Sequence, residues 1–298
     1  MQKSLVYVLI FSFLATAAFA TDVNVGIYVL NLGKFDISTG SFTADFYVSL
    51  TCKEECPPQK FEFMNGRAIS RDIDKVIDQP NEKFYRIFAN LVSPVDLKRF
   101  PFDTQHMQII LEDKLSTIEN ISYVPAIKES GIDPSIIFPG WQIHGWNATV
   151  TEHHYPVYNE TYSQYAFTVT ISRIALNSFL KTFLPVIFIV LIVMFSFLID
   201  LDKIPVRLGI VGSSLIGAVM FHVSITNQIP AVSYLTFADK FMLLSYIIIL
   251  YAFILNAVLL ELQERGKGEL AQRIHSVTEY SAFYAVPFIY VAFFLLFI

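Results

Sequence analysis

Two patterns of apolar residues divide the chain. From residue 21 to about residue 175, apolar and polar positions alternate in short runs that are separated by turn-forming residues. From about residue 176 to the end, the sequence is almost continuously apolar. Alternation with a period of two is typical of half-buried strands, whereas apolar stretches of about 20 residues are typical of membrane-spanning helices. The pattern therefore predicts an all-β domain followed by a transmembrane domain.

The first part is predicted to be a β-sandwich. In its clearest strand, residues 164–172, large apolar side chains at every second position face one way: Tyr165, Phe167, Val169 and Ile171. Runs of the same kind occur at 23–31, 41–51, 84–92, 105–112 and 141–152. Several short strands with turn signals between them favour two packed sheets.

The second part contains four apolar segments, at residues 176–199, 204–226, 237–260 and 281–298. Each can cross a bilayer, the last only just, which predicts an all-α four-helix transmembrane domain after an extracellular all-β sandwich. Two of the connections are basic: one contains Lys203 and Arg207, the other Arg265, Lys267 and Arg273. By the positive-inside rule, these loops are cytoplasmic. We therefore expect a multi-pass protein of the plasma (inner) membrane, with its N-terminal domain extracellular or periplasmic.

The first 20 residues are predicted to be a secretory signal peptide. Lys3 precedes an apolar run at 5–14, and Ala18-Phe19-Ala20 offers a cleavage site with small residues. A retained membrane anchor is the alternative, but the apolar run is short for a span. The domain assignment is therefore a signal peptide at 1–20, a ligand-binding β-sandwich at 21–175 and a transmembrane domain at 176–298.

The second apolar segment carries a stripe of small and polar residues that lipid would not favour. On a helix, positions three or four apart share one face, and this stripe consists of Arg207, Gly209, Ser213, Ile216, Met220, Ser224 and Asn227. Polar groups inside a membrane usually face a protein interior or a water-filled path. We therefore expect several copies of this helix to line a pore, with Ile216 and Met220 forming apolar rings that can close it.

Charge and cysteine content narrow the interpretation. The formal net charge is −5, and the acidic excess lies in the β domain, which argues against nucleic acid as a partner.

The chain has two cysteines, Cys52 and Cys56. In a straight strand their Cα atoms would lie about 13 Å apart, so a disulfide requires a turn at 53–55. The alternative is that the two cysteines are two ligands of a metal ion, although the sequence offers no second pair of ligands to complete such a site.

A specific motif lies between two predicted strands. Residues 93–105 read S-P-V-D-L-K-R-F-P-F-D-T-Q. This motif resembles the Pro-loop of the pentameric ligand-gated ion channels, the family of the eukaryotic Cys-loop receptors and their bacterial relatives. Eukaryotic members have a cysteine pair around this loop, whereas this chain has Ser93 and Met107. The resemblance is therefore to the bacterial branch.

The resemblance implies a junction between the two domains. It pairs Asp103 with Arg173 as an ion pair, adds Asp36 as a third member, and places Phe100, Pro101 and Phe102 at the tip of the loop. The alternative for Arg173 is an interfacial cation that extends its side chain towards water.

The resemblance also implies an agonist site between neighbouring subunits. The candidate residues are Glu62, Phe63, Arg86, Tyr155, Tyr158 and Tyr162. An aromatic cage would suit a cationic amine, whereas Arg86 would suit a carboxylate, and the sequence does not choose between them. An ordinary solvated hairpin is the alternative for the tyrosines. Between Cys56 and Phe61 this chain departs from the family, because the strand and the Trp-containing motif that the family places there are missing, and the resemblance therefore supports the agonist site less than the fold.

His153 and His154 lie next to each other beside Glu152. Adjacent side chains on a strand point to opposite faces, so the two imidazoles could not easily share a metal ion, and we expect no metal site. A role in pH sensing would fit the titration of histidine near neutrality, but nothing in the sequence singles out either residue.

Together with these patterns, the family resemblance implies a homopentameric ion channel, formed with four further copies of the chain and opened by an extracellular small molecule or proton. Anion selectivity is favoured because residues 205–209 resemble the P-x-R-x-G stretch of anion-selective receptors. The acidic outer domain, Asp200 and Asp202 favour the alternative, a cation-selective or proton-gated channel of the same family.

A membrane-anchored binding or adhesion module without conductance is a second alternative. No nucleophile elbow, phosphate loop or complete set of metal ligands occurs in the sequence, so neither enzymatic activity nor a cofactor is expected. Membrane lipid and permeating ions are the remaining partners implied.

Overall fold

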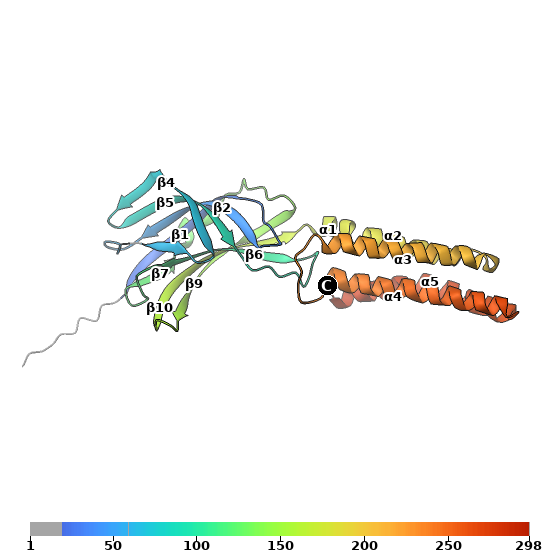
Figure 1. Cartoon of the computed structure of the whole chain (residues 1–298). Coiled ribbons are helices and arrows are strands. Elements are labelled where there is room, and N and C mark those ends of the chain that lie inside the picture. Colours follow the sequence, from blue (N-terminus) through green and yellow to red (C-terminus); the bar gives the residue numbers. More distant parts are fainter. Residues whose placement is uncertain (1–19, 59, 298) are drawn as a thin grey trace, which may run out of the picture.

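The computed structural model describes residues 20–58 and 60–297, and the predicted signal peptide falls almost entirely outside them. Strands occupy the first part of the described chain and helices the second, and the two parts lie end to end (Figure 1). The last strand ends at Arg173 and the first helix begins at Ala175. This arrangement confirms the coarse prediction of β-sheets followed by apolar helices.

One sheet contains six strands. Its main order is β4-β5-β2-β1-β7, formed by Gly66–Gln79, Glu82–Val92, Ser41–Thr51, Thr21–Leu32 and Ile121–Pro125, and β8 (Gly131–Ile132) also pairs with β1. Strand β4 was not predicted, because its sequence shows no regular alternation of apolar and polar residues. It lies at the edge of the sheet and pairs with β5.

The second sheet contains four strands in the order β3-β6-β10-β9, formed by Phe61–Phe63, Thr104–Asp113, Glu160–Arg173 and Trp141–Tyr155. Along β10 the side chains of Tyr165, Phe167, Val169 and Ile171 are buried, as the alternation predicted. They belong to one apolar core together with residues of the first sheet, such as Ile27 and Phe46. Burial of apolar area between the two sheets is the main favourable contribution to this packing.

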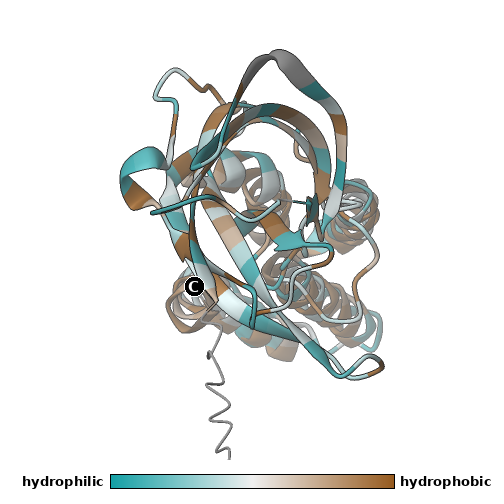
Figure 2. Ribbon diagram, turned by 90° about the vertical axis from the view of Figure 1, so that its left-hand side faces the viewer, coloured by the Kyte–Doolittle hydropathy of each residue, from teal (hydrophilic) through white to brown (hydrophobic). Residues whose placement is uncertain are grey.

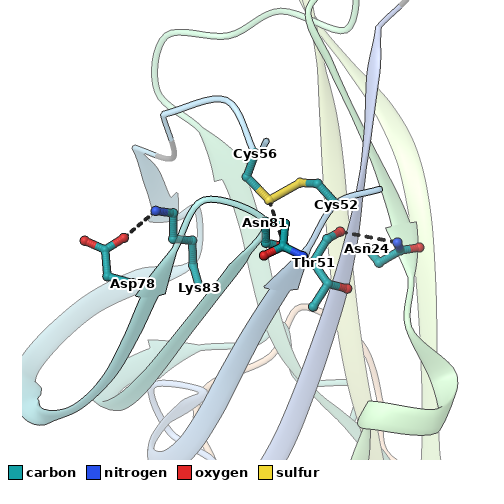
Figure 3. The surroundings of a disulfide bond; sticks show 7 residues. All are labelled: Asn24, Thr51, Cys52, Cys56, Asp78, Asn81 and Lys83. Atoms are coloured by element: carbon teal, nitrogen blue, oxygen red, sulfur yellow. Dashed lines mark hydrogen bonds and ion pairs between the residues drawn. A yellow bond between two sulfur atoms is a disulfide. The ribbon is translucent and has the colours of Figure 1, made fainter. Parts of the chain in front are cut away.

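A short disulfide loop closes one end of the first sheet. Cys52 and Cys56 are joined by a disulfide bond, with their Cα atoms 5.3 Å apart (Figure 3). The loop also bonds to the turn between β4 and β5, because the Cys52 amide donates to Asn81 O and the Cys56 amide donates to Pro80 O. The loop that the disulfide closes therefore links the end of β2 to a hairpin of the same sheet through these hydrogen bonds.

Five α-helices follow: α1 (Ala175–Thr182), α2 (Leu184–Ser196), α3 (Ile204–Thr226), α4 (Phe237–Glu264) and α5 (Gly268–Phe297). Figure 2 shows them coloured mostly as hydrophobic. Within the described part of the chain, α3, α4 and α5 are each long and apolar enough to cross a membrane. The pair α1 and α2 passes the same test together but is bent by 42°, so the number of spans is three, or four if this pair is one span.

Two predicted helix boundaries differ from the structure. The first predicted span is interrupted at Phe183, because Pro185 in the first turn of α2 lacks an amide hydrogen and its ring crowds the preceding turn. The predicted span at 281–298 is the apolar half of a longer helix that begins at Gly268. Helix α5 returns towards the β domain, so that its C-terminal end lies beside the connection between the two parts (Figure 1).

Candidate functional site

Helix α3 has one face against its own chain and one face away from it. Val211, Ala218 and Ile225 are buried in a core shared with α2, α4 and α5. The opposite face forms what we call the exposed stripe: Val206, Gly209, Ser213, Ile216, Met220, Ser224 and Asn227. Ile216 and Met220 are 68% and 66% exposed, and a Cβ atom placed on Gly209 would meet no other atom of the chain. Six of the seven predicted pore residues therefore lie on the exposed side.

The seventh, Arg207, was placed wrongly. Its side chain is fully buried, because it lies two positions before Gly209 and this spacing turns it about 200° around the helix. The Arg207 guanidinium donates through Nη2 to the carbonyls of Phe197 and Ile199, and its nitrogens lie 3.3 and 3.5 Å from the ring of His275. Arg207 therefore joins α3 to the end of α2 and to α5, and Val206 takes its place on the exposed stripe.

His222 lies off the exposed stripe, as predicted from its spacing. Its Nε2 is 3.0 Å from the carboxylate of Asp239, and its Nδ1 is 3.0 Å from the Tyr246 hydroxyl. Both partners belong to α4. The imidazole thus connects α3 to α4 near the end that faces the β domain.

The junction between the domains is built around a buried carboxylate. Asp103 is 1% exposed, and its Oδ1 accepts a hydrogen bond of 2.7 Å from Nε of Arg173. Its Oδ2 accepts a second bond of 2.7 Å from the side-chain amide of Gln105. The Arg173 guanidinium also lies over the rings of Phe100 and Trp141, at 5.0 and 4.7 Å from their centroids. The predicted pair of Asp103 and Arg173 is thus present in the structure.

Residues 93–105, which contain Pro94 and Pro101 and which we call the Pro-loop for that reason, contact the ends of the helices nearest the β domain. Its Phe100–Pro101 peptide bond is cis. The ring of Phe102 stacks on Phe183, with centroids 5.7 Å apart. The first amides of α4 donate to this loop, since Phe237 N bonds to Lys98 O and Ala238 N to Phe100 O, both at 3.0 Å. Because the first amides of a helix have no partner inside the helix, the loop supplies acceptors that α4 needs.

Asp36 does not join the ion pair among the described residues. Its Oδ1 accepts hydrogen bonds from the amide and hydroxyl of Ser38, and these bonds lower the pKa of its carboxyl group. The carboxylate therefore stabilises its own turn. The neighbouring residue, Ile37, packs against both the sandwich core and the helix core, so the loop after β1 still contributes to the junction.

Three of the six predicted agonist residues lie close together on the outer face of the second sheet. The rings of Tyr155 and Tyr162 meet edge to face, with centroids 5.6 Å apart. Glu62 is exposed on β3, and the pKa of Tyr155 is raised first by burial and more weakly by nearby carboxylates that include Glu62. An open cavity of about 700 Å³ adjoins Glu62 and is also lined by Arg67, Arg71 and Lys114. This surface therefore offers aromatic rings beside groups of both charges.

The other three predicted agonist residues are placed differently, although Phe63 also borders the cavity. Phe63 is buried in the sandwich core, where its ring packs against Phe46 and Phe61, because it alternates with the exposed Glu62. Arg86 lies on the first sheet, and its guanidinium makes a bidentate ion pair with Asp45. Tyr158 is 71% exposed in the turn between β9 and β10.

Glu112, at the centre of this surface, was not predicted from the sequence. The carboxylate of Glu112 accepts hydrogen bonds from the Tyr155 hydroxyl at 2.9 Å and the Gln164 amide at 3.1 Å, and His153 Nδ1 lies 2.9 Å from it. The alternation along β6 places Glu112 on the outward face of its sheet. Its burial depends on the neighbouring side chains of β9 and β10, and these were identified only as strands.

Comparison with known proteins supports a membrane channel. No protein-family model matches the sequence. A protein of Gloeobacter violaceus named proton-gated ion channel is 23% identical over 249 residues, which cover 76% of this chain and 69% of that protein. This similarity extends over most of the chain and agrees with the resemblance noted in the Pro-loop.

The buried ion pair at the junction generates a testable prediction. We expect Asp103→Ala to destabilise the protein by about 3 kcal/mol, because it leaves the partly buried Arg173 guanidinium without its carboxylate. Thermal unfolding of the purified full chain should show a midpoint lowered by several degrees.

The matched control is Glu261→Ala. Glu261 pairs with Arg265, but both side chains are more than half exposed, so the loss should be below about 1 kcal/mol. If both substitutions lowered the free energy of unfolding equally, the ion pair of Asp103 would not be a main source of stability at the junction.

Proposed function

We propose that this protein is a homopentameric ion channel of the plasma (inner) membrane, whose outer β domain controls a pore lined by α3. The observation that carries this proposal is the exposed stripe. Gly209, Ser213, Ser224 and Asn227 lie on the side of a membrane-length helix that its own chain leaves uncovered. Such residues find no hydrogen-bond partners in lipid, whereas a ring of identical helices around water provides them.

Two apolar positions on the stripe are suited to close the path. Ile216 and Met220 lie on consecutive turns and are the two most exposed large apolar side chains of α3. In a ring of five helices they form two adjacent apolar collars. Narrow apolar collars lose water easily, and this stops ions without a solid plug.

Control of the pore by the outer domain rests on the junction. The Pro-loop bonds to the start of α4, and α4 contacts α3 through the pair of His222 and Asp239. A ligand opens such a channel only if it binds the open state more tightly than the closed one. We place the ligand surface around Glu62, Tyr155 and Tyr162, and the name of the Gloeobacter relative favours the proton as one ligand.

We assign the ion selectivity from the charged residues at the N-terminal end of α3. The prediction of anion selectivity depended on Arg207, whose buried guanidinium contributes no charge to the exposed stripe. The exposed charges just before α3 are Asp200, Asp202 and Lys203, which are mainly acidic. We therefore propose cation permeation, in agreement with the acidic outer domain.

Accessibility of the stripe tests the pore directly. Ser213 is exposed and Ser214 is buried, although they are adjacent. In planar-bilayer recordings, a charged methanethiosulfonate reagent should block Ser213→Cys channels irreversibly and leave Ser214→Cys channels unchanged. The native cysteines will not interfere while they remain in their disulfide. If neither variant conducts at any pH or ligand concentration, the chain is instead a membrane-anchored binding module.

Selectivity can be tested with two neighbouring positions. We expect Arg207→Gln to leave the reversal potential in asymmetric sodium chloride unchanged, since the guanidinium faces α2 and α5. Val206→Glu adds a carboxylate to the exposed stripe and should move the reversal potential further towards the sodium equilibrium potential. A wild-type reversal potential that follows chloride would contradict cation permeation. A large shift in Arg207→Gln alone would place Arg207 in the pore.

A further inference from the structure

A buried carboxylate holds the hairpin of β9 and β10 against β6. Glu112 is 3% exposed although it lies on the outward face of its sheet. It is covered by His153 and Tyr155 from β9 and by Gln164 from β10, and we call these four residues the Glu112 cluster. The imidazole of His153 also lies against the Tyr155 ring, with centroids 4.3 Å apart.

The contact between His153 and Glu112 requires a hydrogen on one particular nitrogen. Nδ1 of His153 is 2.9 Å from Oε2 of Glu112. A carboxylate only accepts hydrogen bonds, so the contact holds when Nδ1 carries a hydrogen. In a neutral ring with its hydrogen on Nε2, the two atoms would be two acceptors in contact. Uptake of a proton at Nδ1 converts this repulsion into a charge-assisted hydrogen bond.

The other two side chains of the cluster, Tyr155 and Gln164, keep donating hydrogen bonds whether or not His153 has taken up a proton. Burial first, and then the bond to Glu112, raises the pKa of Tyr155 to about 12, so its hydroxyl stays a donor. The Gln164 amide lies 3.1 Å from Oε2 of Glu112 and 3.2 Å from Nδ1 of His153. Gln164 therefore donates either to the unprotonated ring or to the carboxylate, and it can follow the proton without losing its bond.

The other charged or titratable groups around His153 come from three strands. On β3, Glu62 is opposite Glu112 and pairs at 3.5 Å with Lys114, which follows β6. On β10, Tyr162 is opposite His153 and donates to Glu160. On β9 itself, Glu152 and His154 occupy alternate positions that point to the other face. Carboxylates thus outnumber cations among the neighbours on this face.

We propose that His153 and Glu112 form a proton-binding site, and that proton uptake closes the β9–β10 hairpin onto β6. Its effect on the pore rests on the proposed function. The strand pairing offers a route, since β10 pairs with β6 from Gln164 and Glu112 down to Ser172 and Thr104. Arg173 is the next residue of β10, Asp103 immediately precedes β6, and the two form the ion pair of the junction.

The test compares two adjacent histidines in the full chain. His153→Gln removes the titrating ring, whereas His154→Gln changes an exposed imidazole whose Nδ1 contacts the Thr161 hydroxyl instead. Hydrogen exchange of hairpin amides 155–160 is measured at pH 7.5 and pH 5.5 in lipid nanodiscs and corrected for intrinsic rates. In the wild type and in His154→Gln, we expect acidification to slow exchange at least about tenfold, the range of one charged hydrogen bond.

In His153→Gln this pH-dependent slowing should disappear, and the same result is expected for Glu112→Gln. Retention of the full tenfold slowing in His153→Gln would overturn the proposal. The exchange measurement needs no conductance, so it separates this proposal from the proposed function. Loss of slowing in His153→Gln in a chain that does not conduct would support the proton site and contradict only the channel.

Discussion

The ion pair between Arg173 and Asp103 is the interaction on which the connection of the two domains depends. A carboxylate that is 1% exposed is costly to bury unless its charge is compensated, and Arg173 and Gln105 compensate both of its oxygens. This arrangement fixes the end of β10 to the start of β6. The Pro-loop between β5 and β6 is thereby held where its aromatic tip can enter the helix core.

The β domain was predictable because its strands alternate between a buried and an outer face, and all six predicted strands occur. Strand β4 was not, since the sequence of this edge strand shows no such period. In the candidate site, Asp103 and Arg173 were identified through a local motif. Glu112 could not be found in this way, because its burial arises from residues about 40 to 50 positions away in the sequence.

Helix α3 shows how one sequence satisfies two environments. Its inner face packs on its own chain through Val211, Ala218 and Ile225, and its exposed stripe is left for contacts outside the chain. The wrong placement of Arg207 came from extending this stripe by two residues instead of three or four. Arg207 therefore has a structural role at the N-terminal end of α3, where it donates hydrogen bonds to carbonyl groups at the end of α2.

The hydrogen bonds from the first amides of α4 to the Pro-loop restrict the kind of motion that can pass between the domains. Lifting the β domain away from the membrane would leave Phe237 N and Ala238 N without acceptors in an apolar setting. A rotation about this contact preserves both bonds. The motion compatible with these bonds is therefore a rigid-body rotation of the β domain about the Pro-loop. In such a rotation the residues farthest from the helices move most and the Pro-loop moves least.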